Sequence, residues 1–277
     1  MSSFPTPWPE DSYGRVKRLN FVAQAWDPSI ASVLDVGCGT GSQLTLPLAR
    51  MYPGVTFLGI DSDAASLAQG RSDSPPANLA FQHSDALDPD RRFDLVIASE
   101  VLEHVEDPAG FLGWLGQRLT PGGRIVLTVP NGYGPFEWAQ LAETFATLSG
   151  IWPAIRRLKR CLIGGGAETT SDTLAVSPHV NFFSQSQLRR LFDEAGLVVA
   201  IQANRTLLCG FLLDQLVGAL RIAPCNARLA DRLPVWAVSD WMMVLKPAHA
   251  PRESTWVRTY WGSFRRRLNF RRWGIAP

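Results

Sequence analysis

The sequence lacks several features that would assign the protein to common functional classes. Its four cysteines are far apart, with no CxxC pair and no histidine at zinc-ligand spacing, so we expect reduced thiols. The 27 basic and 25 acidic residues give a net charge of +2. Such a charge creates no global field for nucleic acid, and we expect no specific nucleic-acid partner. The longest apolar run, residues 207–220, is interrupted by Asp214 and is shorter than the roughly 20 residues of a membrane span.

A signal peptide is also missing from residues 1–15, which carry prolines and acidic side chains where a basic start and an apolar run would be needed. We therefore expect no export and a cytoplasmic protein, at most peripheral to the inner face of the membrane. The 46% hydrophobic content over 277 residues is enough for a substantial core.

Short apolar runs alternate with helix-like stretches between residues 31 and 130, which is typical of a parallel sheet with helices on both faces. The predicted strands are residues 32–36, 56–60, 79–82, 93–98, 124–129, 197–203 and 236–246. The predicted helices are residues 14–25, 42–51, 64–71, 108–119 and 185–195. This pattern predicts an α/β fold, a doubly wound and mostly parallel seven-stranded sheet, with the last strand antiparallel.

Two long segments interrupt the pattern and define the expected organisation. We expect a lead-in with a helix at 1–30, a ligand-binding half at 31–130, an insertion at 131–183, the rest of the sheet at 184–246 with a second insertion at 204–234, and a basic tail at 247–277. Open α/β sheets bind ligands at the carboxyl ends of their strands. Both insertions are therefore expected to cover a substrate pocket at that edge.

Three glycines at alternate positions, Gly37, Gly39 and Gly41, follow the first predicted strand and its Asp35. Glycines here allow the backbone to approach a ligand closely, and the helix beyond them directs free N–H groups at it. A nicotinamide-dependent oxidoreductase would prefer G-x-G-x-x-G, whose third glycine would fall on Ser42. A structural tight turn is the alternative explanation.

Two carboxylates strengthen the case for a nucleoside ligand. Asp61 ends the second predicted strand, where a carboxylate can accept hydrogen bonds from both hydroxyls of a ribose. Asp85 follows the third strand, where it can meet an exocyclic amine.

The runs VLDVGCGTG, LGIDSD, SEVLEHVEDP and LTPGGRIVLTVPN occur in this order, and over residues 18–246 they resemble the class I S-adenosylmethionine-dependent methyltransferases. The nearest relatives in character are ubiquinone-biosynthesis O-methyltransferases and glycan-associated relatives. The resemblance implies S-adenosylmethionine as cofactor and methyl transfer to an oxygen of a small-molecule, sugar or lipid-linked acceptor. The cofactor residues it implies are Arg18, Asp35, Gly37, Gly39, Gly41, Asp61, Ser62, Asp85, Ala86, Ser99 and Glu100.

Methyl transfer to a hydroxyl benefits from a general base, for which histidine is the usual side chain. His179, at the end of the first insertion, is the first candidate, and His104 is the second. A structural histidine that bonds to loop backbone is an equally good interpretation of His179.

Glu100, Glu103 and His104 share one face if their segment is helical. Similar quinone O-methyltransferases are thought to bind magnesium with the equivalent residues. Because magnesium prefers oxygen ligands over imidazole, we expect no metal and a polar cluster that shapes the cofactor pocket.

Cations interleave with apolar residues at 151–163 and again in the tail, a pattern that suits weak contact with an anionic membrane. The tail arginines are Arg265, Arg266, Arg267, Arg271 and Arg272, worth together at most about 5 kcal/mol. A solvated helix face and a disordered tail are the alternative. A non-catalytic protein that binds the cofactor for regulation also remains open.

Overall fold

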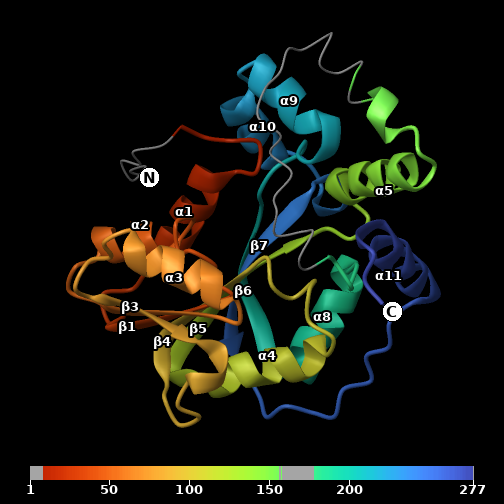
Figure 1. Cartoon of the computed structure of the whole chain (residues 1–277). Coiled ribbons are helices and arrows are strands. Elements are labelled where there is room, and N and C mark those ends of the chain that lie inside the picture. Colours follow the sequence, from red (N-terminus) through yellow and green to blue (C-terminus); the bar gives the residue numbers. More distant parts are fainter. Residues whose placement is uncertain (1–8, 156, 158–177, 277) are drawn as a thin grey trace.

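One seven-stranded sheet with helices on both faces forms the body of the protein (Figure 1). The computed structural model describes residues 9–155, 157 and 178–276. The strands are β1 (Ser32–Val36), β2 (Thr56–Asp61), β3 (Leu79–His83), β4 (Phe93–Ser99), β5 (Leu119–Pro130), β6 (Leu197–Asn204) and β7 (Asp240–Pro247). The α-helices are α1 (Arg15–Gln24), α2 (Thr45–Met51), α3 (Ala64–Ser72), α4 (Pro108–Gln117), α5 (Pro135–Leu148), α8 (Gln185–Glu194), α9 (Phe211–Ala219), α10 (Ala223–Ala230) and α11 (Tyr260–Trp273).

The strand order is β3-β2-β1-β4-β5-β7-β6. Neighbouring strands from β3 to β5 run parallel, whereas β7 is antiparallel to both β5 and β6. The doubly wound, mostly parallel sheet predicted from the sequence is confirmed, including its antiparallel last strand.

Alternate side chains of the central strands enter two separate cores. In β1, Leu34 packs with the helices α4 and α8, while Val33 packs with α1, α2 and α3. Ala98 and Ile97 of β4 divide between the two cores in the same way. A strand buried on both faces needs an apolar residue at nearly every position, which explains the continuous apolar runs in the sequence.

Three predicted boundaries were wrong by several residues. Strand β5 begins at Leu119 rather than 124, because Phe93 N–H donates to the Arg118 carbonyl (2.7 Å) and extends the pairing backwards. The register then shifts between Phe93 and Leu95, where Gly122 (φ 84°) lies in the longer strand. Strand β7 begins at Asp240 rather than 236, because residues 235–237 form a 3₁₀ turn. Helix α2 begins at 45 rather than 42.

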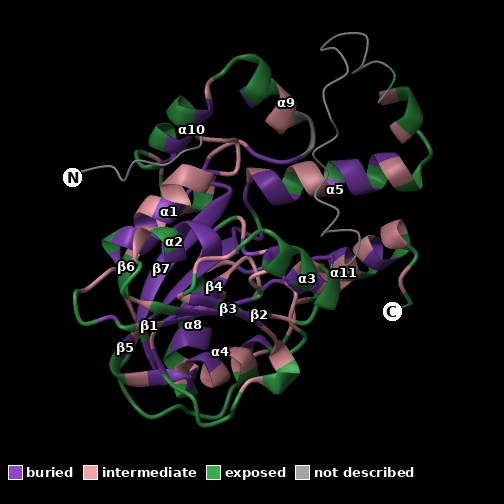
Figure 2. Cartoon of the chain, turned by 60° about the vertical axis from the view of Figure 1, so that its left-hand side comes forward, coloured by how far each residue is buried: buried purple, intermediate pink, exposed green. Residues whose placement is uncertain are grey.

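The described parts of both insertions lie at one end of the sheet, with α5, α9 and α10 grouped together in the upper part of Figure 1. The tail carries an ordered helix, α11, which packs against α5, so the alternative of a disordered tail was wrong (Figures 1 and 2). Residues 156 and 158–177 of the first insertion, which include part of its basic segment at 151–163, lie outside the described residues. Among the helices of the described residues, none combines the length and apolar character needed to cross a bilayer.

Candidate functional site

The candidate site lies where the parallel strands end. Asp61 is the last residue of β2 and Ser99 the last residue of β4, while Asp35 is the last residue but one of β1. Because β7 is antiparallel, its first residue, Asp240, reaches this same edge. The strand directions therefore bring side chains from distant parts of the chain to one edge.

The glycine turn holds three residues at positive φ, with Gly37 at 69°, Gly39 at 55° and Gly41 at 74°. A Cβ on Gly37 would come within 2.5 Å of a methyl group of Val101, so only glycine fits there. Asp61 is fastened to this turn, since its Oδ2 accepts from Gly39 N–H (2.7 Å). The carboxylate expected to bind ribose thus lies directly beside the backbone expected to approach the cofactor.

Asp35 is buried, and its Oδ2 accepts a hydrogen bond from the Thr45 hydroxyl at the start of α2. Burial raises the pKa of Asp35 to about 7, against the opposing effects of Thr45 and the positive charge of Arg18. The side chain of Asp35 therefore changes from the neutral acid to the carboxylate as the pH rises through neutrality.

The residues expected to bind adenine are more exposed. Asp85 lies in the short 3₁₀ helix at residues 84–86, and its side chain is 89% exposed beside His83. Ala86 accepts a hydrogen bond from Gln82 through its carbonyl. The Ser62 carbonyl is 3.1 Å from His83 Nε2, which ties the ends of β2 and β3 together.

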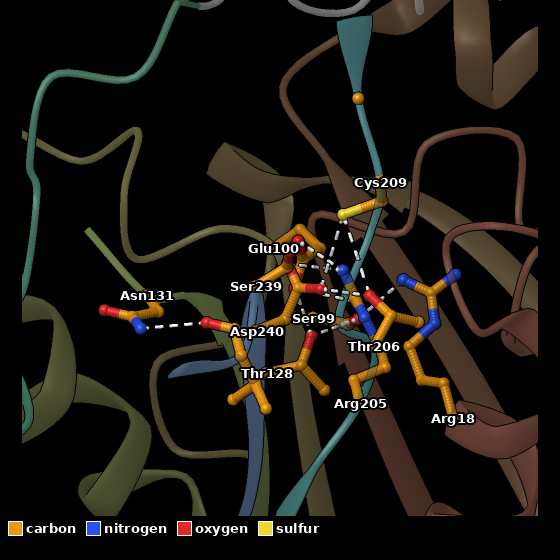
Figure 3. Close-up of polar contacts among 12 residues, drawn as sticks. Arg18, Ser99, Glu100, Thr128, Asn131, Arg205, Thr206, Cys209, Ser239 and Asp240 are labelled. Atoms are coloured by element: carbon orange, nitrogen blue, oxygen red, sulfur yellow. Dashed lines mark hydrogen bonds and ion pairs between the residues drawn. The ribbon is translucent and has the colours of Figure 1, made fainter. Parts of the chain in front are cut away.

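A chain of hydrogen bonds crosses the carboxyl edge from α1 to β7 (Figure 3). Arg18 Nη1 donates to Ser99 Oγ (3.1 Å), Ser99 Oγ is 2.8 Å from Thr128 Oγ1, and Thr128 donates to Glu100 Oε1 (2.6 Å). Since Thr128 has one proton and gives it to the carboxylate, Ser99 is the donor to Thr128. Arg205 binds Glu100 at the end of this series of hydrogen bonds.

Arg205 follows β6 and binds two carboxylates at once. Its Nη2 is 3.1 Å from Glu100 Oε2 and 2.9 Å from Asp240 Oδ1, and its Nη1 is 3.0 Å from Glu100 Oε1. Burial alone would raise the pKa of Glu100, but Arg205 and Arg18 outweigh it and lower that pKa. Glu100 is thereby held as an anion and committed to Arg205.

Arg18 differs from Arg205 because its hydrogen-bond partners are neutral, namely Ser99 and Gln43. Burial and the neighbouring charge of Arg205 lower the pKa of Arg18 to about 10, which still leaves it charged at neutral pH. A half-buried cation whose hydrogen bonds go to neutral groups favours an anionic ligand group. The sequence expectation that Arg18 binds the carboxylate of the cofactor fits this position.

A second cluster begins three residues after Glu100. The segment is not α-helical: Glu100 adopts φ 59°, and residues 102–104 form a turn. The condition under which Glu100, Glu103 and His104 would share a helix face is therefore not met. Glu103 and His104 instead meet His179, which arrives from the end of the first insertion.

His179 is buried and hydrogen-bonded through Nδ1 to Glu137 Oε1 of α5 (2.6 Å). Glu137 also binds the buried guanidinium of Arg265 on α11. Burial would lower the pKa of His179, but the charge and hydrogen bond of Glu137, together with Glu103, raise it to about 9. By contrast, burial and the proximity of His179 lower the pKa of His104 to about 4. The two candidate bases therefore carry different charges at neutral pH.

Glu103 is 1% exposed, and neither of its carboxylate oxygens has a hydrogen-bond partner among the described residues. Burial, reinforced by the charge of Glu100, raises its pKa well above the usual range. Glu103, His104 and His179 each offer one ligand atom within 4.8 Å of the others, so the three could hold a metal ion.

Sequence reasoning missed four residues of these two clusters: Arg205, Asp240, Glu137 and Arg265. A basic residue directly after a strand and an acidic residue at the start of the next were the only local signals for Arg205 and Asp240. Glu137 and Arg265 were assigned to a cap and a basic tail, and no local pattern pairs them.

The chain is similar in sequence to a known protein family and to known methyltransferases. The methyltransferase-domain family matches residues 13–201. Trans-aconitate 2-methyltransferase of Deinococcus radiodurans is 40% identical over 103 residues, covering 37% of this chain and 39% of that protein. A ubiquinone biosynthesis O-methyltransferase of Rhodopseudomonas palustris (strain BisB5) is 35% identical over 198 residues, covering 69% of this chain and 66% of that protein. The match to the first of these relatives thus spans about two-fifths of its length.

Solved structures share the fold. PKMT2 from Rickettsia typhi superposes with a TM-score of 0.55 at 17% identity, over 90% of this chain and 56% of that one. The same protein in complex with AdoHcy gives 0.52 at 16% identity, with the same coverage. With the family match across more than half of its length, the chain belongs to the methyltransferase-domain family.

Proposed function

We propose that the protein transfers the methyl group of S-adenosylmethionine to an oxygen of a small-molecule, sugar or lipid-linked acceptor. The observation that carries this proposal is the buried cluster of Glu103, His104 and His179 next to the cofactor edge. A hydroxyl is a weak nucleophile until its proton is removed or its charge is stabilised, and this cluster holds the groups for that task. The similarity to ubiquinone biosynthesis O-methyltransferases supports an oxygen acceptor.

The cofactor residues have separate proposed roles. Arg18 binds the carboxylate of the methionine part, while Asp35 and the backbone of Gly37, Gly39 and Gly41 border its amino group. Asp61 and Ser62 hold the ribose, and Asp85 and Ala86 the adenine. Ser99 and Glu100 lie beside the sulfonium end of the cofactor. Their hydrogen bonds with Thr128 hold Arg18 in position.

Bound S-adenosylmethionine supplies a methyl group on a sulfonium, and the electron pair of the breaking S–C bond stays on sulfur while a new O–C bond forms. The protein positions the acceptor oxygen in line with that bond and excludes water, which can supply about 7–11 kcal/mol of the barrier. The proton of the hydroxyl passes to the cluster of His179, His104 and Glu103. Because the pKa of His179 is about 9, His179 is already protonated in most molecules at neutral pH, and only the small neutral fraction can accept a proton. His104, with a pKa of about 4, is neutral at that pH.

Residues 131–183 and 204–234 form the proposed acceptor cap. Helices α5 and α9 pack together above the sheet, and Phe136 of α5 contacts His179 with a ring separation of 5.9 Å. These contacts support an acceptor pocket whose apolar wall and His179 come from the same insertion.

Two measurements test the proposal. Equilibrium dialysis with labelled S-adenosylmethionine measures binding, and transfer of label from the methyl group into a cell extract measures catalysis, followed by identification of the labelled product. We expect a base-stable O-methyl product that is absent with His179→Ala and His104→Ala. Binding without transfer to any extract would favour the regulatory alternative, and an N- or C-methylated product would contradict an oxygen acceptor.

We also propose weak peripheral contact with anionic membranes, but through fewer cations than the tail contains. Arg265 is buried and Arg266 and Arg272 form ion pairs, which leaves Arg267 and Arg271 as exposed cations of α11. At about 1 kcal/mol per cation, they support only salt-sensitive adhesion. Flotation with phosphatidylserine vesicles at low salt should be reduced by a double charge reversal at these two positions; no flotation of the wild type would contradict the proposal.

A further inference from the structure

A buried carboxylate whose oxygens accept no hydrogen bond from the described residues is the starting observation. Glu103 is 1% exposed, and both of its oxygens lack a hydrogen bond among the described residues. A buried carboxyl group is costly unless it is paired, hydrogen-bonded or coordinated to a metal. Its surroundings therefore indicate what the fold is arranged to hold there.

Two imidazoles direct the same nitrogen towards this carboxylate. Nε2 of His104 is 3.8 Å and Nε2 of His179 is 3.9 Å from Glu103 Oε1. These separations are too long for hydrogen bonds. Two ligands of one tetrahedral zinc ion, with bonds of about 2.0–2.1 Å, lie about 3.3 Å apart. The two carboxylate–imidazole separations exceed this value by about half an ångström, and no two of the three ligand atoms lie more than 4.8 Å apart, so side-chain movements that shorten these separations by at most about 1.5 Å would bring all three to one ion.

The opposite ring nitrogens face acceptors, as metal-binding histidines require. Nδ1 of His104 lies 3.4 Å from the Pro178 carbonyl, and Nδ1 of His179 lies 2.6 Å from Glu137 Oε1. An acceptor at Nδ1 fixes the tautomer that leaves Nε2 with a lone pair, and it orients the ring. Arg265 of α11 in turn binds Glu137, so the outer shell extends to the C-terminal helix.

The backbone holds the two halves of the cluster together independently of these side chains. The N–H groups of Val180 and Asn181 both donate to the Glu103 carbonyl, at 2.9 and 3.0 Å. The Asn181 amide also donates to the Val105 carbonyl (2.6 Å), and Asn269 of α11 donates to the His179 carbonyl (3.0 Å). His179 is therefore fixed beside Glu103 by four hydrogen bonds around it, before any ion binds.

This arrangement disagrees with the magnesium set that the sequence resemblance implies. Glu100 would have to supply an oxygen, but its carboxylate is occupied by Arg205 and Thr128. His179 replaces Glu100 as the third candidate ligand, so the candidate ligands are two imidazole nitrogens and one carboxylate. Imidazole suits zinc and related transition ions, whereas magnesium requires oxygen.

We propose that Glu103, His104 and His179 form a binding site for one divalent transition ion of the zinc type, with Glu137 and Arg265 as its outer shell. The inference departs from the expectation that the protein has no metal, and it deepens the proposed function, on which its catalytic meaning rests. A bound ion of this type supplies a Lewis acid next to the proposed acceptor. Metal binding itself can be measured without acceptor or cofactor.

The test uses full-length, tag-free protein treated with a chelator and then titrated with Zn²⁺, Co²⁺ or Mg²⁺. We expect one equivalent of Zn²⁺ to bind, Co²⁺ to give the intense visible absorption of a low-symmetry, four-coordinate ion, and Mg²⁺ to bind at least tenfold more weakly. His179→Ala and His104→Ala should abolish the stoichiometric binding. Glu137→Gln should weaken it by roughly 10–100-fold, as loss of an outer-shell partner does.

Two controls keep the outcome clear. His249→Ala removes an exposed histidine on the opposite end of the sheet and should leave Zn²⁺ binding unchanged. Binding of AdoHcy by each variant reports whether the cofactor half is folded. Binding of Zn²⁺ that survives His179→Ala, or a stoichiometric preference for Mg²⁺ that is lost with Glu100→Gln, would overturn the proposal. Methyl transfer by a metal-free protein would overturn only its catalytic meaning, and absence of methyl transfer with intact Zn²⁺ binding would count against the proposed function alone.

Discussion

Asp35 allows the electrostatics of the cofactor edge to be tested without a substrate. Its side chain is 3% exposed, and burial raises its pKa to about 7, although the Thr45 hydrogen bond and the Arg18 charge act in the opposite direction. A carboxyl whose pKa is higher in the folded than in the unfolded chain binds protons more tightly when folded. The folded state therefore loses stability as the pH rises from the unfolded pKa, near 4, to the folded pKa, near 7.

Asp35→Asn keeps the size of the side chain and an oxygen that can accept from Thr45, but it removes the charge. A shift of about three pKa units at 1.36 kcal/mol per unit corresponds to about 4 kcal/mol at pH 8, and to less than about 2 kcal/mol at pH 5. The free energy of unfolding of the variant, relative to the wild type, should therefore increase by about 2.5 kcal/mol between pH 5 and pH 8.

Urea denaturation of the cofactor-free protein at pH 5, 6, 7 and 8 measures this difference. Asp94→Asn is a control of opposite sign. Burial tends to raise the pKa of Asp94, but hydrogen bonds from Thr120, Ala31 and Ser32 lower it, so its stabilisation is lost on acidification. The deficit of Asp94→Asn should shrink between pH 5 and pH 3. A constant or decreasing advantage of Asp35→Asn from pH 5 to pH 8 would refute the reasoning.

Three further predictions concern the turn, the ribose carboxylate and the C-terminal helix. Saturating AdoHcy, at a hundredfold over its dissociation constant, should stabilise the wild type by about 2.7 kcal/mol, and Asp61→Asn should lose most of this in thermal denaturation; an unchanged shift would exclude Asp61 from the site. Gly37→Ala should abolish AdoHcy binding because its Cβ meets Val101, whereas Gly39→Ala, with open space around it, should weaken binding less, as calorimetry can measure. Arg265→Ala should destabilise the fold by about 1.5–3 kcal/mol in urea, because it removes one of the two charged partners of the buried Glu137 and leaves only His179, while the exposed Arg267→Ala should change stability by less than about 0.5 kcal/mol.

The sheet could be predicted because its signals are local. Val33, Leu34 and their neighbours form an apolar run that is buried on both faces, and the carboxylates at the ends of β2 and β3 lie one or two residues beyond such runs. A parallel sheet then brings Asp35 and Asp61 to one edge without further information. Errors arose where a local pattern had two solutions, as at Leu119, where a turn-forming sequence was included in a strand with a shifted register.

The cluster of Glu103, His104 and His179 could be predicted only in part, because the contacts of Glu100 depend on Arg205, 105 positions away. Spacing alone placed Glu100 with Glu103 and His104 on one helical face. The positive φ of Glu100 instead sends its carboxylate to Arg205, and the place beside Glu103 is taken by His179. A residue's chemistry is thus set by which opposite charge the topology delivers to it, and sequence spacing does not contain that information.

The C-terminal helix illustrates the same limit with a larger consequence. Its arginines form a basic run, for which solvent or a membrane is the simplest local interpretation. Arg265, however, pairs with Glu137, 128 positions earlier, and Arg272 pairs with Glu143 on the same helix, α5. Glu137 is also the acceptor for His179, so the orientation of a candidate catalytic histidine depends on a helix at the opposite end of the sequence. Since a buried acid on α5 needs a cation to offset its desolvation, neither the acidic residues of α5 nor the arginines of α11 can be interpreted alone.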